Sequence, residues 1–478
     1  MLRVASGSLG VVEVWLITET MERAAAPTSD YVARGLEHLW VHTAQYNDLA
    51  QDDGFVVIER GEGIYLDEMG GKRYIDAMSG LWVVAVGHGR QELADVAAEQ
   101  MSRLSFANPF AYATPPAVDL ASKLAELTPS TINKFFFVNS GSEAVDTAIR
   151  MAKQYHYNRG DSKRYKVISR IGSYHGTTLG ALSVNGSPMM NRAPFEPLLP
   201  GVIAVPNTNG FGALKNEETG LDDMFWARYI EEMIKFEKPE TIAALIAEPI
   251  STANGSRVPS QEYWQHLRKV TEEHGILLIH DEVIDGFGRT GKWFASEHFG
   301  IEPDLLTMAK QISSGYAPIA AVGASDKVAE AFVGGKKEAF VGGSTWGAHP
   351  VSCAVALANL NILERERLPE NSATTGEYLG EQLEALKSKH KIVAETRGIG
   401  LMRSVDLKRD PETGEEFKDE DELGKRMPRL LLEAGILSRA GASIQVAPPL
   451  VINREEVDSL VDGLSQAIGG LESELGIA

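Results

Sequence analysis

The chain has 478 residues, of which 44% are hydrophobic and 23% are charged, an ordinary composition for a globular protein with enough length for about two or three domains. The formal net charge of −20 argues against nucleic acid and anionic membranes as partners, and no apolar run reaches the length of a membrane span. A single cysteine, Cys353, rules out an intramolecular disulfide and a cysteine metal cluster and suits a reducing cytoplasm. We therefore expect a cytoplasmic globular protein without a bound metal.

Residues 1–20 contain a short apolar run at residues 11–17, with Arg3 ahead of it. Glu13 interrupts this run and no convincing small-residue cleavage site follows it, so the segment is a poor match to a signal peptide. We expect instead a non-native or poorly ordered extension ahead of Met21.

Short strands are predicted at residues 56–58, 64–66 and 73–75, because each stretch is apolar or branched and is bounded by turn residues. Gly70 and Gly71 supply the turn between the last two strands. The segment Ser79-Gly80-Leu81-Trp82 follows. Helical periodicity with polar outer faces then predicts helices at residues 91–104 and 115–127.

A strand predicted at residues 135–138 turns into a helix through the sequence NSGSE at residues 139–143. Ser140 and Glu143 have the spacing of a capping box. The expected buried stripe of the helix is Val145, Ala148, Ile149 and Ala152. Unpaired backbone N–H groups and the helix dipole make such a helix start suitable for an anion, although the same residues also serve as an ordinary cap.

Polar residues follow two further apolar strands. The strand predicted at residues 166–169 precedes Tyr174-His175-Gly176, and the strand predicted at residues 242–247 ends in Glu248. An amphipathic helix is predicted between them and the next strand, at residues 261–274, and Gly275 is expected to end it.

Two acids and a lysine follow the next two apolar runs. The run at residues 276–279 leads to Asp281 and Glu282, and the run at residues 305–309 leads to Lys310. Ligands bind at the carboxyl ends of strands in open α/β sheets. An acid that keeps a ring nitrogen protonated and a lysine that holds an aldehyde covalently are what pyridoxal phosphate requires. The pattern therefore predicts a pyridoxal 5′-phosphate site.

The glycines between these strands also satisfy two nucleotide-binding patterns. Gly286, Gly288 and Gly291 fit the dinucleotide pattern G-x-G-x-x-G, and residues 286–292 fit part of a P-loop. The dinucleotide pattern needs its first glycine directly after the strand and a helix at its end, whereas residues 281–285 intervene here and residues 292–294 are a poor helix start. A P-loop needs Ser or Thr after its lysine, and this chain has Trp293. Both nucleotide interpretations are disfavoured.

The last part of the chain is predicted to contain a strand at residues 319–324, a glycine-rich loop at residues 333–343 and a long helix from about residue 351, followed by an α+β segment. Cys353 lies in a small, apolar helical run, so we expect it in the core. The acidic and turn-rich residues 410–422 are expected to form a solvated loop.

The combination of Asp281-Glu282-Val283, GFGRTG at residues 286–291 and Lys310 resembles the signature of class III aminotransferases, which are pyridoxal-phosphate enzymes of the fold type I group. SGSEA at residues 140–144 and RGIGL at residues 397–401 are similar to further family motifs. The resemblance implies an α/β protein whose large domain, residues 86–346, has a mostly parallel central sheet flanked by helices. A small α+β domain would be built from both chain ends, an N-terminal segment at residues 1–85 and residues 347–478.

The resemblance also implies the roles of the site residues. Lys310 would hold the cofactor aldehyde as a Schiff base and act as a base, Asp281 would keep the pyridine nitrogen protonated, and Tyr174 and Val283 would enclose the ring. The other implied cofactor contacts are Ser140, Gly141, Ser142, His175, Gly176, Glu248 and Thr345.

Thr345 lies in the sequence STWGAHP at residues 344–350, which departs from the family's TYSGHP in its middle positions. In the family this threonine reaches the cofactor phosphate of the neighbouring subunit, which implies a homodimer or a tetramer. Leu81 and Trp82 resemble the segment at the substrate entrance. Arg439 resembles a mobile arginine that pairs with a substrate carboxylate and swings away for an apolar amine; an ordinary surface arginine is the alternative.

The closest resemblance is to the amine and β-alanine:pyruvate branch. It implies transfer of an amino group from an amine or ω-amino acid to a keto acid such as pyruvate, through the Lys310 Schiff base and a pyridoxamine intermediate. Decarboxylation or an intramolecular amino shift on the same scaffold stays open, because the cofactor motifs do not fix the reaction type. An NAD-dependent oxidoreductase and a non-catalytic binding protein are the weaker alternatives.

Overall fold

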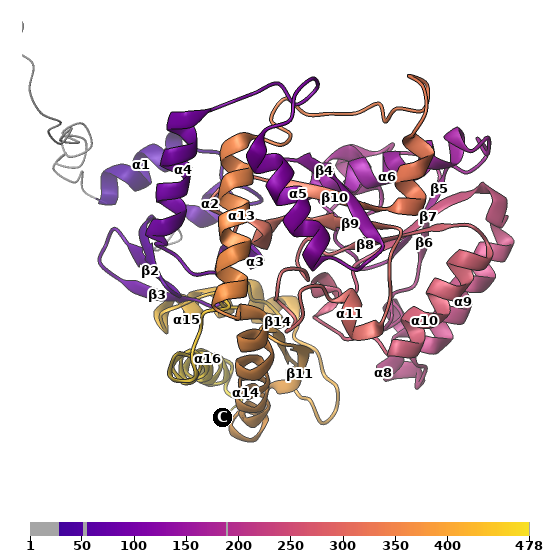
Figure 1. The fold of residues 1–478 in the computed structure, drawn as a ribbon. Helices are drawn as coiled ribbons and strands as arrows, with labels where there is room; N and C mark the ends of the chain where they lie inside the picture. The colour runs from indigo at the N-terminus through magenta and orange to yellow at the C-terminus, as the bar shows by residue number, and fades with distance from the viewer. Residues whose placement is uncertain (1–27, 51–54, 188–189, 478) are drawn as a thin grey trace, which may run out of the picture. The chain divides into compact units, whose positions relative to one another are not determined.

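The computed structural model describes residues 28–50, 55–187 and 190–477 (Figure 1). The extension expected at residues 1–20 lies outside the described residues. The chain divides into two compact units, Met1–Arg60 with Leu66–Arg73, and Gly61–Tyr65 with Tyr74–Ala478. The domain boundaries expected at residues 85 and 346 remain a prediction.

The first unit contains the helices α1 (Thr28–His38) and α2 (Tyr46–Leu49). Three short strands each include residues of both units, β1 (Ile58–Glu62), β2 (Tyr65–Glu68) and β3 (Arg73–Asp76). The predicted turn lies between β2 and β3, with Gly71 at a φ of +88°. The first strand covers Ile58–Glu62 and not the predicted residues 56–58. Most of its residues are polar and exposed, so a search for apolar runs does not find them.

The central sheet of the second unit has seven strands in the order β4-β10-β9-β8-β7-β5-β6. Their bounds are Ile132–Val138 (β4), Lys166–Arg170 (β5), Val202–Val205 (β6), Ile242–Ala247 (β7), Leu277–Asp281 (β8), Leu305–Met308 (β9) and Ala320–Ser325 (β10). Strands β5 to β9 pair in parallel, whereas β10 is antiparallel to both β9 and β4. The mostly parallel sheet expected from the sequence is confirmed.

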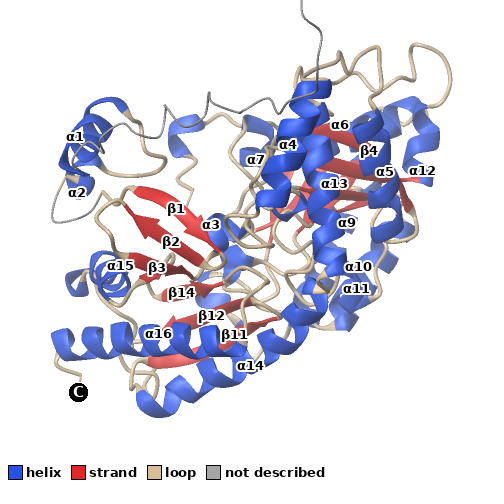
Figure 2. Cartoon of the chain, turned by 60° about the vertical axis from the view of Figure 1, so that its left-hand side comes forward, coloured by secondary structure: helices blue, strands red, loops and turns tan. Residues whose placement is uncertain are grey.

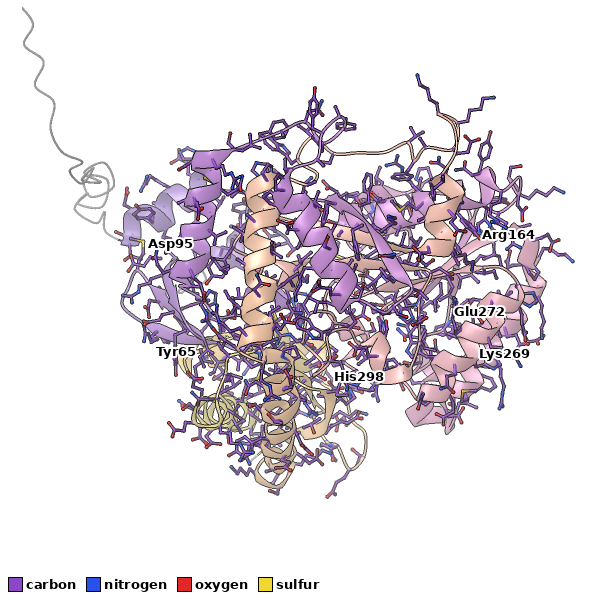
Figure 3. All side chains as sticks on the ribbon, viewed as in Figure 1. Tyr65, Asp95, Arg164, Lys269, Glu272 and His298 are labelled. Atoms are coloured by element: carbon purple, nitrogen blue, oxygen red, sulfur yellow. The ribbon has the colours of Figure 1, made fainter. Side chains whose placement is uncertain are left out.

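Helices cover both faces of this sheet (Figure 1). Ala244 and Ile246 of β7 belong to a buried cluster with α6 (Gly141–Asn158), whereas Leu245 and Ala247 belong to another with α9 (Asp223–Phe236) and α10 (Gln261–Glu273). A strand buried on both faces reads as a continuous apolar run because its side chains alternate between the faces. On the outer side of α10, Lys269 and Glu272 point away from the sheet (Figure 3).

The helices α4 (Gln91–Arg103) and α5 (Pro115–Leu127) pack against α13 (Pro350–Arg365), and all three agree with the predicted helices. Cys353 of α13 is fully buried, as expected. No helix in the described part of the chain is both long and apolar enough to cross a membrane.

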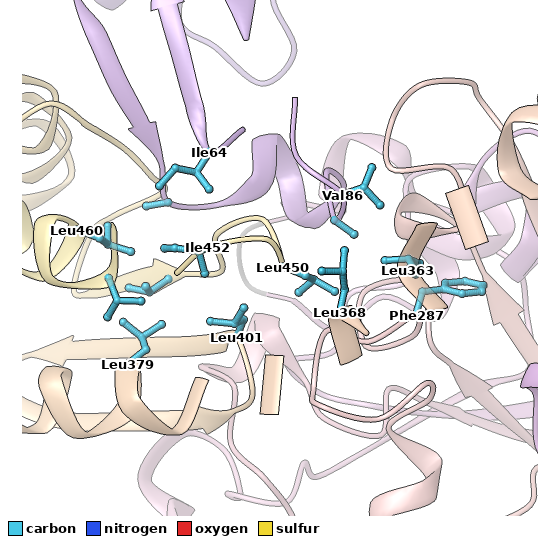
Figure 4. Packing of buried hydrophobic residues seen from close by; sticks show 14 of the residues in the cluster. Ile64, Val86, Phe287, Leu363, Leu368, Leu379, Leu401, Leu450, Ile452 and Leu460 are labelled. Atoms are coloured by element: carbon cyan, nitrogen blue, oxygen red, sulfur yellow. The ribbon is translucent and has the colours of Figure 1, made fainter. Parts of the chain in front are cut away.

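A three-stranded antiparallel sheet completes the C-terminal part of the chain, with β12 (Met402–Leu407) between β11 (Val393–Ile399) and β14 (Ser443–Val446). The helices α14 (Leu368–Lys389) and α16 (Arg454–Leu475) pack together beside it (Figure 2). Their buried residues form one cluster with Phe287 and Leu450 (Figure 4).

The acidic residues 410–422 are mostly exposed, as expected. Asp421 is the exception, since it is buried and its Oδ1 lies 2.6 Å from Nη1 of Arg409. The β13 strand (Ile436–Leu437), farther along the chain, pairs in parallel with β3.

Candidate active site

Asp281 is the last residue of β8 and is 4% exposed. Its Oδ1 accepts hydrogen bonds from the Thr307 hydroxyl (2.9 Å) and the Val283 N–H (3.2 Å), and its Oδ2 lies 2.7 Å from His175 Nδ1. A carboxylate has about four acceptor positions, so these contacts leave one position, on Oδ2, for a further donor. Thr307 was not predicted. It reaches Asp281 because β9 pairs with β8 in a register that places the two residues opposite each other.

Lys310 follows β9 and opens a short 3-10 helix, Lys310–Ile312. Its Nζ donates to the Leu81 carbonyl (3.1 Å) and lies 5.3 Å from the centroid of the Trp82 ring. The structure thus brings together Lys310, Leu81 and Trp82, which the sequence separates by more than two hundred residues.

The side chain of Lys310 is partly exposed to solvent, but enough protein surrounds it to change its acidity. Burial lowers the pKa of Lys310 from 10.5 to about 8; Asp281 opposes this change, while Arg439 and Arg289 add to it. A lysine with such a pKa is partly unprotonated near neutral pH and is suited to act as a nucleophile and a base.

The start of α6 has the geometry expected for an anion site. The Ser140 side chain accepts a hydrogen bond from the Glu143 N–H (3.2 Å), which caps the helix. The predicted capping box is only half formed, because the Glu143 carboxylate accepts from the N–H of Asn139 (2.8 Å) and not from that of Ser140. The first N–H groups of a helix have no partner within it, so those of α6 are available to an anion.

Two glycines allow segments to approach this helix start closely. A Cβ on Gly141 would lie 2.9 Å from Val283 Cγ1, and a Cβ on Gly176 would lie 2.9 Å from Ser142 Cα. Gly176 also has a φ of +114°, which strongly favours glycine. The Ser142 hydroxyl accepts from the Thr177 N–H (3.1 Å), so the segment that carries Tyr174 and His175 is attached to the start of α6.

Asn185 holds the same segment from the other side and was not predicted. Its Oδ1 accepts from the His175 N–H (2.9 Å), and its Nδ2 donates to the Gly176 carbonyl (3.0 Å). It lies in an irregular stretch after a short helix, where nothing in the sequence pattern marks it.

Glu248 also binds the segment that carries Tyr174 and His175. Its Oε1 accepts from the Tyr174 N–H (2.9 Å) and from the Ser251 hydroxyl (3.0 Å), and Arg170 Nη2 lies 3.4 Å from its Oε2. Burial would raise the pKa of Glu248, but the charges of His175 and Arg170 hold it below its ordinary value. Glu248 therefore joins the network around Asp281, as expected, and Arg170 is a member that the sequence did not indicate.

Glu282 lies beside Asp281 in the chain but serves another part of the structure. Its carboxylate accepts from the N–H groups of Ala295 and Ser296 (both 2.8 Å) and from the Ser296 hydroxyl (2.5 Å). Burial raises the pKa of Glu282 from 4.5 to about 7. Successive residues at a strand end point to opposite faces, so only Asp281 faces the site.

The glycine motif at residues 286–291 packs closely against residues of the C-terminal part of the chain. A Cβ on Gly288 would lie 3.1 Å from Leu450 Cδ1, and one on Gly291 would lie 2.9 Å from Ala373 Cβ. Between them, Arg289 is fully buried and donates to the carbonyls of Leu401 (2.9 Å) and Pro448 (2.6 Å). No helix begins at Gly291, which agrees with the weak standing of the nucleotide interpretations.

Arg439 is close enough to Lys310 and Tyr174 for its charge to affect the pKa of both. Its positive charge lowers the pKa of Lys310, and it opposes the increase that burial causes in the pKa of Tyr174. Its carbonyl accepts from the Gln445 N–H (3.0 Å), which fixes the backbone, while the side chain is exposed and forms no ion pair with any described residue.

Thr345 lies in an exposed part of the loop before α13. The neighbouring Ser344 accepts from Asn139 Nδ2 (2.7 Å). The predicted contact of Thr345 is with the cofactor phosphate of the neighbouring subunit, and it stays a prediction.

Residues 46–468 match the sequence model of the family described as aminotransferase class-III. The chain therefore belongs to the class III aminotransferases. It is 36% identical to the putrescine–pyruvate aminotransferase of Pseudomonas aeruginosa over 441 residues, which cover 91% of this chain and 95% of that protein.

Two solved structures are also similar to the chain. The crystal structure of a thermostable (S)-enantioselective omega-transaminase from Thermomicrobium roseum has a TM-score of 0.87 at 40% identity, covering 94% of this chain and 99% of that one. The omega transaminase from Pseudomonas jessenii in complex with PMP has a TM-score of 0.86 at 37% identity, covering 93% of this chain and 98% of that one. The predicted fold type I architecture, aminotransferase activity and dependence on pyridoxal 5′-phosphate are confirmed.

The described residues fit this cofactor. The open position on Asp281 Oδ2 suits a protonated ring nitrogen, and the free N–H groups at the start of α6 suit a phosphate. The lowered pKa of Lys310 suits a covalent bond to an aldehyde.

Proposed function

We propose that the chain transfers an amino group from an amine or ω-amino acid to pyruvate, with Lys310 and Asp281 as its catalytic residues. The observation that carries this proposal is that Lys310, which has a lowered pKa, follows the strand that pairs with the one ending in Asp281, and that Arg439 is close enough for its charge to lower this pKa further. The named substrates of the relative from Pseudomonas aeruginosa, putrescine and pyruvate, support the choice of an amine donor and a keto-acid acceptor.

When bound, pyridoxal phosphate accepts the electrons that a substrate carbon retains as it loses a proton. Lys310 Nζ is the group that removes this proton and returns it on the cofactor side. Asp281, as a carboxylate, holds a proton on the ring nitrogen. Burial would lower the pKa of His175, but Glu248 and Asp281 raise it above its ordinary value, which favours a positively charged imidazole beside Asp281.

The remaining site residues bind and orient. Tyr174 and Val283 enclose the ring, and Gly176 lets the backbone approach it. The proposed phosphate contacts are Ser140, Gly141, Ser142 and, from the second subunit of a homodimer, Thr345. The dimer is part of the proposal because the resemblance of residues 344–350 to the family motif implies that Thr345 reaches the cofactor phosphate of the neighbouring subunit.

Arg439 binds the carboxylate of pyruvate or of an amino-acid donor, because its guanidinium is free and can form two parallel hydrogen bonds. Leu81 and Trp82 line the same space next to Lys310. A donor without a carboxylate would displace Arg439 toward solvent, where it is already exposed.

The test is the variant Lys310→Ala, assayed with a panel of amines and pyruvate for the formation of alanine. We expect a folded protein that binds the cofactor without a covalent bond, so that borohydride attaches no cofactor to it, and no detectable turnover. Lys153→Ala is the matched control, since burial also lowers the pKa of Lys153 but the residue lies in the second half of α6, where it lines a cavity with Asp146 and Leu199 rather than with Lys310. Turnover by Lys310→Ala equal to that of the control would contradict the assignment.

A further inference from the structure

Asp76 is a buried acid whose contacts are almost all with backbone. It is 1% exposed, and its Oδ1 and Oδ2 lie 2.8 and 2.7 Å from the N–H of Gly80. The Met78 N–H also donates to Oδ1 (3.3 Å), and His88 Nε2 lies 2.8 Å from Oδ2. One carboxylate thus holds the backbone of the turn that follows β3.

This turn has an unfavourable backbone conformation. Ser79, Gly80 and Trp82 have φ angles of 48°, 66° and 56°, and residues other than glycine rarely adopt such angles. Strained conformations persist only when surrounding contacts determine them. Asp76 supplies those contacts on one side of the turn. On the other side the Ser79 hydroxyl donates to the Ala447 carbonyl and accepts from Arg289 Nη2 (3.0 Å).

The turn ends against the catalytic lysine. The Leu81 carbonyl, one residue beyond Gly80, accepts from Lys310 Nζ (3.1 Å), and the Trp82 ring centroid lies 5.3 Å from the same atom. Neither contact would form if residues 79–82 relaxed to ordinary φ angles, because the Leu81 carbonyl would then point elsewhere.

We propose that Asp76 is a positioning residue that fixes the turn at residues 78–82 and thereby holds the Leu81 carbonyl and the Trp82 ring against Lys310 Nζ. The effect of Asp76 on catalysis rests on the proposed function of Lys310. The contact between the turn and the lysine is independent of that role and is measurable in the full chain after removal of the cofactor.

The proposal has a consequence that a purely structural role of Asp76 would not have. A hydrogen bond accepted by the Leu81 carbonyl favours the ammonium form of Lys310. If the turn loosens, this hydrogen bond is lost, but so is part of the burial of Nζ, which has the larger effect, and the pKa of Lys310 rises from about 8 toward its ordinary value of 10.5.

The experiment measures the rate at which acetic anhydride acylates Lys310 over a series of pH values, with the Lys310 peptide quantified by mass spectrometry. In Asp76→Ala we expect the midpoint of the labelling curve to move to higher pH by about 0.5 or more, as a partial relief of the burial of Nζ predicts. Asp76→Asn keeps Oδ1 as an acceptor for Gly80 and should move the midpoint in the same direction by less.

The matched control is Asp304→Asn. Asp304 is 2% exposed and accepts from the Leu278 N–H (2.9 Å), but it precedes β9 at the opposite edge of the sheet from Lys310. It should lower the melting temperature without moving the Lys310 midpoint. In the holoenzyme, kcat/KM for the amine should fall about tenfold in Asp76→Ala and hardly change in the control.

An unchanged midpoint in the two Asp76 variants would overturn the proposal. If Asp76→Ala does not fold, Asp76→Asn decides in the same way. A shifted midpoint in the Asp76 variants, together with unaltered transamination by Lys310→Ala, would contradict the proposed function but support the contact between the turn and Lys310.

Discussion

His175 Nδ1 lies 2.7 Å from Asp281 Oδ2, and the His175 ring places its other nitrogen 3.8 Å from Glu248 Oε2. One imidazole is thus enclosed between two buried acids that belong to neighbouring strands. Because both acids favour the charged imidazole, the pKa of His175 is raised despite its burial. The raised pKa of His175 favours a positive charge directly beside the Asp281 carboxyl group.

Asp281→Asn should lower kcat about a hundredfold or more, because an amide does not provide the negative charge that a protonated ring nitrogen requires. Cofactor binding through the phosphate contacts should persist. Glu282→Gln is the control, since its carboxylate binds the N–H groups of Ala295 and Ser296 instead. Steady-state kinetics of both variants decide the matter, and a larger loss in Glu282→Gln would show that the two acids have the opposite roles.

Glu282→Gln should also change how stability depends on pH. The pKa of Glu282 is about 7 in the folded protein against an ordinary value of 4.5, so the folded state binds the proton more tightly. The contribution of this group to stability is present below pH 4.5 and is lost as the pH rises to about 7. Melting temperatures measured across this window should fall less steeply in Glu282→Gln than in the wild type. Parallel curves would contradict the assigned pKa.

Thr345→Ala should weaken cofactor binding, and mixing it with Lys310→Ala tests the proposed dimer. If Thr345 acts across the interface, a mixed dimer has one site with both lesions and one site with neither, so that activity partly returns. Recovery is measured after subunit exchange has been verified with differently tagged chains. The absence of recovery would place Thr345 in the site of its own chain.

Arg439→Ala should affect substrates with a carboxylate selectively. The efficiency with pyruvate, and with β-alanine as donor, should fall about tenfold or more, on the scale of a lost charge-assisted hydrogen bond. The half-reaction with an amine that lacks a carboxylate should hardly change. Single-turnover bleaching by such an amine, compared with regeneration by pyruvate, separates the two. Arg454→Ala, on the exposed side of α16 near Tyr378, is the control, and equal losses in both half-reactions would contradict the role of Arg439.

The strands that carry the site could be predicted because of their burial. β7, β8 and β9 are buried on both faces, so each reads as a continuous apolar run with a polar residue at its carboxyl end. Their ends were placed to within two residues, and the resemblance then supplied the roles of Asp281 and Lys310.

The residues that orient the site could not be predicted in this way. Thr307 and Arg170 act through contacts between segments that are distant in sequence, whereas Asn185 contacts His175 only ten positions earlier. No hydrophobic pattern marks either kind of contact. The predicted capping box is half formed for a local reason, since the Glu143 carboxylate accepts from the N–H of Asn139 instead of that of Ser140. The sequence disfavoured nucleotide binding by the glycine motif but did not predict its packing role. That role depends on Pro369, Ala373 and Leu450, which only the folded chain brings near the glycines.

The hydrogen bond from Ser79 to Ala447 joins residues that are 368 positions apart. During synthesis this hydrogen bond of the turn beside Lys310 cannot form until almost the whole chain has been made. At about 5–20 residues per second this wait lasts on the order of 20 to 70 s, in which the nascent chain exposes the apolar surface that the last strand and helix later cover. The proposed catalytic pocket is therefore incomplete for most of the time of synthesis, and molecular chaperones that bind hydrophobic segments can act in that interval.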